Sequence, residues 1–128
     1  MKYLLDTHTY FWWKDEMDRL SAKVRELLSD PENELLLSVV TPWELAIKVK
    51  AGKLDAMQLL QNFEERESAA GFIVTRTTAA QAIHSGLLPL RHKDPFDRLL
   101  AAQALDLKVP LLSRDRIFDL YGVERIWD

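Results

Sequence analysis

The chain has 128 residues and no cysteine, which excludes disulfide scaffolds, cysteine-ligated zinc, iron–sulfur centres and thiol nucleophiles. Its length predicts one domain over residues 1–128, and its composition, 48% hydrophobic and 29% charged, is typical of a globular protein. The net charge of -3 excludes a general basic surface for nucleic acid, although not a local basic patch. No apolar run approaches the roughly 18 residues of a membrane span, so we expect a soluble, cytoplasmic protein.

Short apolar runs alternate along the chain with segments of helical periodicity. Strands are expected over residues 3–5, 34–40, 72–75, 109–113 and 123–127, and helices over 22–30, 42–52, 55–71, 77–86, 94–105 and 116–120. Several helix starts have a short polar residue that can accept a hydrogen bond from a free backbone N–H. These residues are Ser21, Thr41, Asp55 and Asp94, and Pro42 suits the first helical position after Thr41.

The strands are continuously apolar, which is typical of strands that are buried on both faces. Alternation of such strands with helices predicts an α/β fold, a three-layer α/β/α sandwich around a parallel sheet of roughly five strands. In sheets of this kind, ligands bind beyond the carboxyl ends of the strands. Residues that follow a strand, or that lie in the first turn of the next helix, are therefore the candidates for chemistry.

Four carboxylates occupy such positions. Asp6 ends the first strand, and Asp115 lies two residues past the fourth. Glu44 and Asp97 are each expected at the third position of a helix. The carboxyl ends of parallel strands meet at one edge of the sheet, so we expect all four side chains to face the same crevice.

Clustered carboxylates repel one another, by about 1 kcal/mol for two charges 4 Å apart in water and about 4 kcal/mol at an effective dielectric of 20. Such a site sheds protons or binds a cation. Hard oxygen ligands without histidine or cysteine suit Mg²⁺ or Mn²⁺. A cation of this kind lowers the pKa of water and neutralises charge on a phosphodiester, so the reaction class is metal-assisted hydrolysis of a phosphate ester.

Each acid also has a purely structural interpretation. Thr41 and Glu44 have the spacing of a capping box, in which Glu44 would bond to the N-cap backbone. Asp97 stands in the same relation to Asp94 and would favour the positive end of the helix dipole. Asp115 could be a turn residue before a short helix. Asp6 is the hardest to explain structurally, because a carboxylate directly after a buried strand is costly unless it is paired or used.

The sequence resembles the PIN-domain ribonucleases, and among them the VapC-type toxins of type II toxin–antitoxin pairs. The resemblance covers essentially the whole chain and rests on four segments. They are Tyr3-Leu4-Leu5-Asp6-Thr7-His8, Thr41-Pro42-Trp43-Glu44-Leu45-Ala46-Ile47-Lys48, Asp94-Pro95-Phe96-Asp97-Arg98-Leu99-Leu100-Ala101-Ala102-Gln103-Ala104, and Leu111-Leu112-Ser113-Arg114-Asp115. The third segment is the most specific.

This resemblance implies a Mg²⁺- or Mn²⁺-dependent endoribonuclease, a frequent homodimer, and a small antitoxin that docks near the active site and blocks it. The family's acidic quartet, the catalytic and metal-binding set, maps onto Asp6, Glu44, Asp97 and Asp115. Ser113 corresponds to the family's polar residue near the last acid. Thr7 follows the first acid, and either hydroxyl could orient water. Asp94 is interpreted mainly as a helix cap, and secondarily as an additional residue of the metal site.

Cations gather beside the acids in the sequence, where they could contact the phosphates that supply most of the affinity for RNA. The alternative for each of these residues is that it is a solvated surface charge that does not contact RNA. The candidates are Lys48, Lys50, Lys53, Arg91, His92, Lys93, Arg98, Arg114 and Arg116, of which Lys48, Lys93, Arg98 and Arg114 are placed in the predicted RNA interface.

Aromatic and apolar side chains allow two interpretations as well. Trp12 and Trp13 could stack on an RNA base or anchor the antitoxin, or they could pack in the core or in a dimer. Trp43 is expected in packing. The stripe of Leu59, Leu60 and Phe63 is core by default, and an antitoxin groove if it is exposed.

Other functions compete with the nuclease. A non-catalytic module of the same fold, binding RNA or protein, is the main alternative. The intact quartet argues against it. An aspartyl-nucleophile phosphatase needs a second aspartate two residues after the first, where this chain has His8. Cleavage of DNA uses the same site chemistry and stays open.

Overall fold

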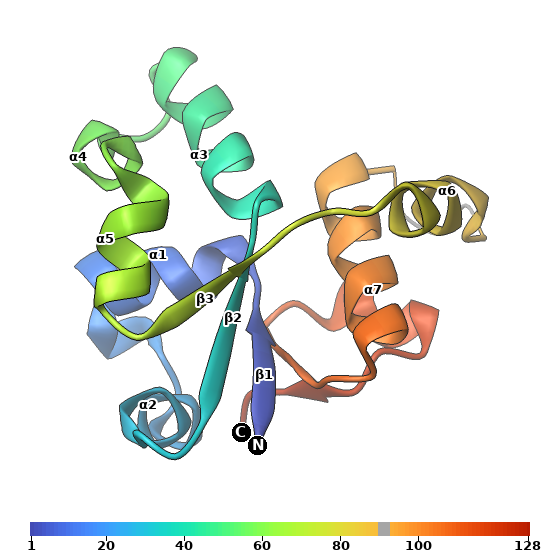
Figure 1. Ribbon diagram of the computed structural model, residues 1–128, viewed down its shortest axis with the longest axis horizontal. Coiled ribbons are helices and arrows are strands. Elements are labelled where there is room, and N and C mark those ends of the chain that lie inside the picture. Colours follow the sequence, from blue (N-terminus) through green and yellow to red (C-terminus); the bar gives the residue numbers. More distant parts are fainter. Residues whose placement is uncertain (90–92) are drawn as a thin grey trace.

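A five-stranded parallel sheet forms the centre of the computed structural model, which describes residues 1–89 and 93–128 (Figure 1). The strands are β1 (Lys2–Leu5), β2 (Glu34–Ser38), β3 (Phe72–Thr75), β4 (Leu111–Leu112) and β5 (Arg125–Ile126). Their order is β3-β2-β1-β4-β5, and every neighbouring pair is parallel. The predicted parallel α/β architecture is thus confirmed, and β2, β4 and β5 are shorter than the apolar runs suggested.

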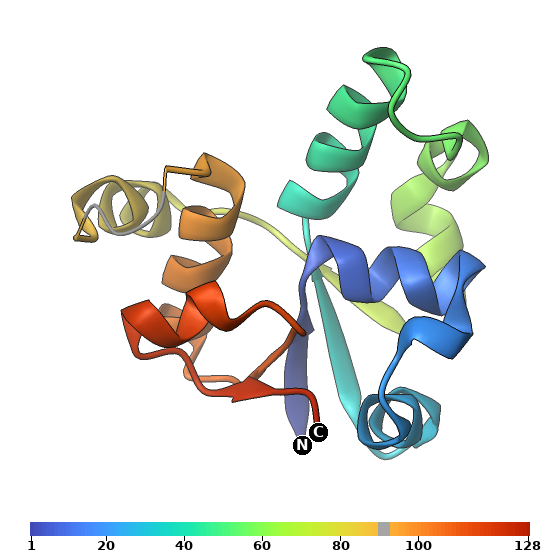
Figure 2. The same ribbon diagram turned by 180° about the vertical axis from the view of Figure 1, so that it is seen from behind.

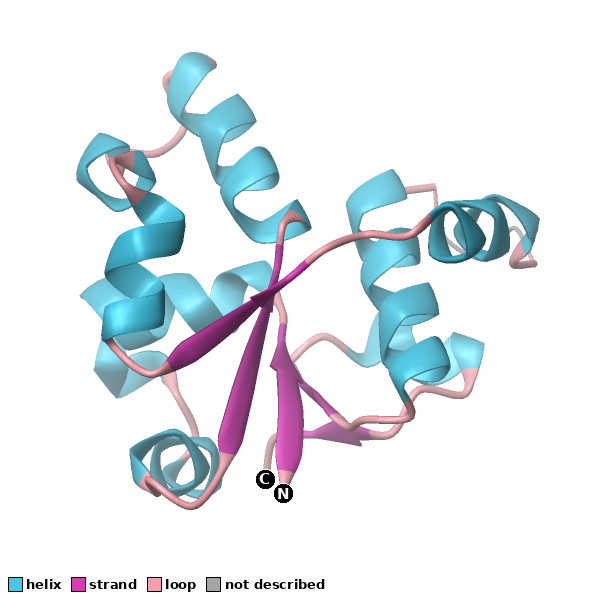
Figure 3. Cartoon of the chain, in the orientation of Figure 1, coloured by secondary structure: helices cyan, strands magenta, loops and turns pink. Residues whose placement is uncertain are grey.

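Helices cover both faces of this sheet, as Figures 1 and 2 show from opposite sides and Figure 3 shows by type of element. They are α1 (Thr7–Asp15), α2 (Ala22–Ser29), α3 (Val40–Lys50), α4 (Met57–Leu60), α5 (Phe63–Ala69), α6 (Ala79–Leu87) and α7 (Pro95–Leu107), with short 3₁₀ helices η1 (Met17–Arg19) and η2 (Arg116–Tyr121). No helix in the described part of the chain is both long and apolar enough to cross a membrane.

Two hydrophobic cores lie on the two faces of the sheet, because successive side chains of a strand point to opposite faces. On one face, Leu5 and Leu37 pack with Tyr10 of α1 and with α2 and α5. On the other face, Leu4 and Leu36 pack with α7 and η2. α3 contributes to both cores and stands at the carboxyl ends of the strands. The sheet is therefore buried on both sides, as its continuously apolar strands predicted.

Three helices differ from the prediction. α1 was not predicted at all. α3 begins at Val40 and has no side-chain cap, so Thr41 is not its N-cap and Pro42 is not its first residue. The helix expected over 55–71 is two helices, because Asn62 adopts a left-handed conformation with φ 51° between α4 and α5. Asparagine tolerates that conformation better than most residues.

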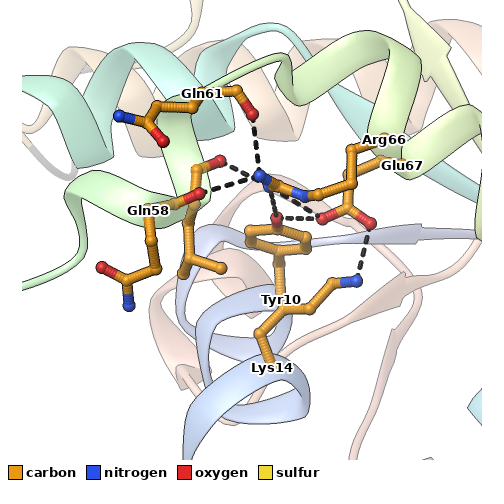
Figure 4. A network of polar contacts seen from close by, with 7 residues as sticks. Tyr10, Lys14, Gln58, Gln61, Arg66 and Glu67 are labelled. Atoms are coloured by element: carbon orange, nitrogen blue, oxygen red, sulfur yellow. Dashed lines mark hydrogen bonds and ion pairs between the residues drawn. The ribbon is translucent and has the colours of Figure 1, made fainter.

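A buried polar network joins α1 to α5 (Figure 4). The carboxylate of Glu67, fully buried, accepts a hydrogen bond from the Tyr10 hydroxyl and pairs with Lys14 at 2.7 Å and Arg66 at 3.3 Å. Arg66 also donates to the carbonyls of Gln58 at 2.8 Å and Leu59 at 2.6 Å. Burial and the neighbouring Glu67 raise the pKa of Tyr10, so its hydroxyl stays a donor. The network fixes α1, which begins at the predicted active site.

Candidate active site

Asp6 links the central strand to the first helix. It follows β1 and is the N-cap of α1, where its Oδ1 accepts a hydrogen bond from the Thr9 N–H at 2.7 Å. The Ser113 hydroxyl donates to Oδ2. The side chain is buried, with 5% of its residue surface exposed, and this burial raises the pKa of Asp6 although the Ser113 and Thr9 hydrogen bonds oppose the rise. The sequence therefore places a desolvated carboxylate at the carboxyl end of β1.

Ser113 joins two of the predicted acids. Its Oγ donates to Asp6 and accepts a hydrogen bond from the backbone N–H of Asp115 at 3.0 Å. Asp115 is exposed and caps η2 by accepting from the Ile117 N–H at 3.0 Å, so its predicted turn role is confirmed. Asp6 and Asp115 line one cavity of about 320 Å³, which we call the acidic cavity; its other walls are His8, Trp12, Arg114 and Arg116.

Glu44 lies farther along α3 than predicted. Because the N-cap is Val39, Glu44 is in the second turn of the helix rather than at its third position. Its side chain is buried and pairs with Lys48 at 3.3 Å, and it makes no capping box with Thr41. The hydroxyl oxygens of Thr41 and Thr7 are 3.5 Å apart, which places the start of α3 against the start of α1.

Asp97 is the third residue of α7, as predicted. Asp94 caps the helix and accepts from the N–H groups of Phe96 at 2.9 Å and Asp97 at 3.4 Å. The rings of Trp43 and Phe96 meet edge to face with 4.8 Å between their centroids. The residues immediately before Glu44 and Asp97 are thus in contact, and α3 and α7 begin side by side.

The predicted ligands are carboxylate oxygens, which are the ligand type that a hard divalent cation prefers. Asp6 and Asp115 offer carboxylate oxygens to one cavity, and in the described chain no lysine or arginine pairs with the buried Asp6. Yet within residues 1–89 and 93–128, no three aspartate, glutamate or histidine side chains are gathered closely enough to hold a metal ion. The geometry therefore gathers a pair of acids, with Glu44 and Asp97 on two adjoining helices.

The predicted RNA contacts separate into two kinds. Arg98 is buried, and its guanidinium donates to the carbonyls of Ser85 at 2.9 Å, Leu88 at 2.8 Å and Pro89 at 3.1 Å. It holds α6 to α7, which supports the structural interpretation of Arg98, and its contact with RNA stays a prediction. Arg114 and Lys93 are exposed. Lys48 is partly exposed beside Glu44. Arg91 and His92 lie outside the described residues.

The structure also shows where the aromatic and apolar residues of the prediction lie. Trp12 and Trp13 of α1 are half-buried and both pack against the core, and Trp12 also lines the acidic cavity. Trp43 contacts Phe96 but stays 55% exposed. Phe63 is core, and Leu59 and Leu60 pack against it partly buried. The sequence analysis missed Thr9, whose hydroxyl donates to the Leu112 carbonyl at 2.8 Å; its position three residues after Asp6 was the available signal.

Comparisons with known proteins agree with this geometry. The PIN-domain family model matches residues 3–124. Ribonuclease VapC22 of Mycobacterium tuberculosis is 30% identical over 118 residues, covering 88% of this chain and 86% of that protein.

Two solved structures share the fold. One is VapBC2 from Rickettsia felis bound to a DNA fragment from its promoter, with a TM-score of 0.72, 18% identity and complete coverage of both chains. The other is VapBC-1 from nontypeable Haemophilus influenzae, with a TM-score of 0.68, 22% identity and coverage of 98% and 97%. The chain therefore belongs to the PIN-domain family, and within it to the VapC-type ribonucleases.

Proposed function

We propose that the protein is an endoribonuclease that hydrolyses RNA phosphodiesters to 5′-phosphate and 3′-hydroxyl ends, and that it is the toxin of a toxin–antitoxin pair. The observation that carries this proposal is the Asp6–Ser113–Asp115 unit, a desolvated carboxylate tied to a second acid at the wall of one cavity. Burying Asp6 is costly for the fold alone, and a cationic ligand would offset that cost.

PIN-domain ribonucleases generally depend on a divalent metal, and we propose Mg²⁺ or Mn²⁺ here because the donors are carboxylates. Asp6 and Asp115, which line the acidic cavity, would hold the ion. Asp97 and Glu44, near the starts of the adjoining helices α7 and α3, would have to approach the ion to complete the set, because the described residues bring no three acids together. When bound, such an ion lowers the pKa of water and offsets charge on the phosphodiester.

The chain's own residues supply orientation around these acids. The Thr9 N–H and the Ser113 hydroxyl hold the Asp6 carboxylate in one orientation. Thr7 extends this unit towards α3 through Thr41. Asp94 fixes the first turn of α7 and with it Asp97. Arg114, Lys48 and Lys93 are proposed to contact RNA phosphates.

Cleavage of a labelled single-stranded RNA tests the nuclease. We expect cleavage with Mn²⁺, none with excess chelator, and none by Asp97→Asn under either condition. Asp97 is partly exposed in the first turn of α7 and asparagine is isosteric, so circular dichroism should show a folded variant. Activity that survives both the chelator and Asp97→Asn would contradict the proposal.

The toxin role includes an antitoxin partner, a homodimer and a cytoplasmic location. It is supported by the similarity to Ribonuclease VapC22, and two structures with this fold are named as VapBC complexes. Expression should arrest growth, and co-expression of the neighbouring gene should restore it. Arrest that Asp97→Asn causes equally would argue against a toxin that acts by cleavage.

A further inference from the structure

A second cavity adjoins the acidic cavity and differs from it in charge. It has a volume of about 630 Å³ and is lined by Arg19, Leu20, Ser21, Arg114, Arg116, Arg125, Trp127 and Asp128. We call it the arginine cavity. Arg114 and Arg116 line both cavities, so the two share a wall that flanks Asp115.

Backbone-directed hydrogen bonds build this cavity from distant parts of the chain. Ser21 caps α2 and its hydroxyl donates to the Trp127 carbonyl, 106 residues away. The Arg125 guanidinium donates to the Ser113 carbonyl at 3.2 Å. Ser113 in turn holds Asp6. The walls of the arginine cavity are therefore fixed to the same residue that orients the proposed catalytic carboxylate.

The cavity has a surplus of positive charge. Arg19 pairs with Glu16 at 3.0 Å and Arg125 with Asp119 at 3.0 Å, whereas Asp128 is the acidic residue among the lining side chains. Within the described chain the exposed side chains of Arg114 and Arg116 make no hydrogen bond or close ion pair, although the pKa of Asp119 is lowered by its hydrogen bond with Arg125 and, less strongly, by the charge of nearby Arg116. Guanidinium groups of this kind bind phosphate oxygens in a bidentate manner.

Tryptophan rings stand beside these arginines. Trp12 lines the acidic cavity and Trp127 lines the arginine cavity, and the two rings meet edge to face with 5.9 Å between their centroids. Both are partly exposed. Arginines interleaved with aromatic rings suit single-stranded nucleic acid, in which phosphates pair with cations and bases stack on rings. The rings also pack against the core, and Arg19 lies over the Trp12 ring at 5.9 Å. An acidic peptide would engage the arginines but not the exposed parts of the rings.

We propose that the arginine cavity binds a backbone phosphate of the RNA next to the phosphate that is cleaved. The strand would run from the acidic cavity, past Arg114 and Arg116, to Arg19 and Arg125. This inference rests on the proposed function, since it extends the substrate site of the same nuclease. It assigns substrate binding to Arg19 of η1 and Arg125 of β5, which lie outside the four segments that carry the resemblance to the family.

The test measures binding of a fluorescently labelled single-stranded RNA of about ten nucleotides to the full chain. Excess chelator prevents cleavage during the measurement. The variants are Arg19→Gln and Arg116→Gln, with Arg25→Gln as the matched control, because Arg25 is an exposed arginine on α2 that lines neither cavity. Circular dichroism verifies that every variant is folded.

We expect Arg19→Gln and Arg116→Gln each to weaken binding roughly 3- to 10-fold, with Arg25→Gln equal to the wild type. The slope of log K against log salt should become shallower by about 0.7 for each phosphate contact removed. Affinity and slope equal to those of Arg25→Gln would overturn the inference, as would a wild type that binds no RNA. A preference of the wild type for an oligoglutamate peptide over RNA, lost in both variants, would also overturn it in favour of an acidic protein partner.

A separate readout keeps the two proposals distinguishable. Wild type is assayed for cleavage of the same RNA with Mn²⁺ in place of chelator. If the wild type cleaves RNA and the variants bind RNA as well as the wild type does, only the proposal for the arginine cavity is contradicted. Loss of binding in the variants without any cleavage by the wild type supports the arginine cavity as an RNA site and counts against the nuclease.

Discussion

The hydroxyl of Ser113 donates a hydrogen bond to the carboxylate of Asp6 across a sequence separation of 107 residues. Both residues follow adjacent parallel strands, β1 and β4, which pair Leu5 with Leu112. The same hydroxyl accepts from the N–H of Asp115. Ser113 thus connects two acids that the sequence separates, and the orientation of Asp6 depends on it.

Ser113→Ala should reduce cleavage at least about tenfold, because Asp6 loses one of the donors that hold its carboxylate. The buried acceptor left without a partner should also cost about 1–3 kcal/mol of unfolding free energy. Single-turnover cleavage and urea denaturation measure the two effects. Ser29→Ala is the control, since the exposed Ser29 hydroxyl bonds, among the described residues, to the Arg25 carbonyl alone. Cleavage by Ser113→Ala at the rate of the control would refute the role of the bridge.

Asp6→Asn should make the metal-free protein more stable while abolishing cleavage. Burial raises the pKa of Asp6, so the folded protein binds a proton there more tightly than the unfolded chain. The resulting stabilisation is complete below the unfolded pKa and is lost as the pH rises through the folded pKa. Near neutral pH the wild type carries the cost of a desolvated charge.

Asparagine removes that charge and remains a good N-cap for α1. A melting experiment with chelator should show a higher Tm for Asp6→Asn, where about 1 kcal/mol corresponds to ~4 °C for a chain of this size. The advantage should shrink as the pH falls, because the wild-type carboxyl is then protonated. An equal or lower Tm near neutral pH would mean that the Asp6 charge is already compensated within the chain.

Arg98→Lys should destabilise the protein by about 2–3 kcal/mol, whereas Arg114→Lys should leave stability unchanged. The Arg98 guanidinium serves several carbonyls at the end of α6 at once, and an ammonium group cannot reproduce that planar geometry. Arg114 is exposed. Urea denaturation compares the two variants directly. Equal stability of both would show that the Arg98 contacts contribute little.

Glu67→Gln should cost about 3 kcal/mol or more, because it leaves Lys14 and Arg66 without their buried counter-charge. Glu64→Gln is the matched control. Glu64 pairs with Arg76 at 2.8 Å, but both side chains are more than half exposed, and such pairs contribute about 0–1 kcal/mol. Chemical denaturation measures both. Similar losses for the two variants would show that burial does not strengthen the Glu67 network.

Most of the fold follows from local patterns that tertiary contacts leave unchanged. The apolar strands and the Asp94-Pro95 helix start are such patterns. All five strands lie where they were predicted, although three are shorter, and the helix starts as predicted. α1 escaped prediction because its run Tyr10-Phe11-Trp12-Trp13 is continuously aromatic, so it shows no helical period. Its capping residue is Asp6, and a helix cap was not among the roles predicted for that carboxylate.

The predicted local geometry of the site differs from the structure where packing decides the place of a side chain. Thr41 and Glu44 have capping-box spacing, but α3 starts earlier, at Val40, and Glu44 pairs with Lys48 instead. Arg98 adjoins an acid in sequence, yet its place on α7 turns it into the interior. Sequence spacing locates a residue along an element. It cannot show which face of that element the rest of the fold covers.

The most direct test of the account is to incubate the purified, antitoxin-free protein with total cellular RNA and Mn²⁺, and to sequence the new 5′ ends. Asp97→Asn is the matched control. We predict discrete new ends that carry 5′-phosphate and that only the wild type produces. No new ends from a folded wild type that also binds no Mn²⁺ would contradict the nuclease and indicate a PIN fold used only for binding.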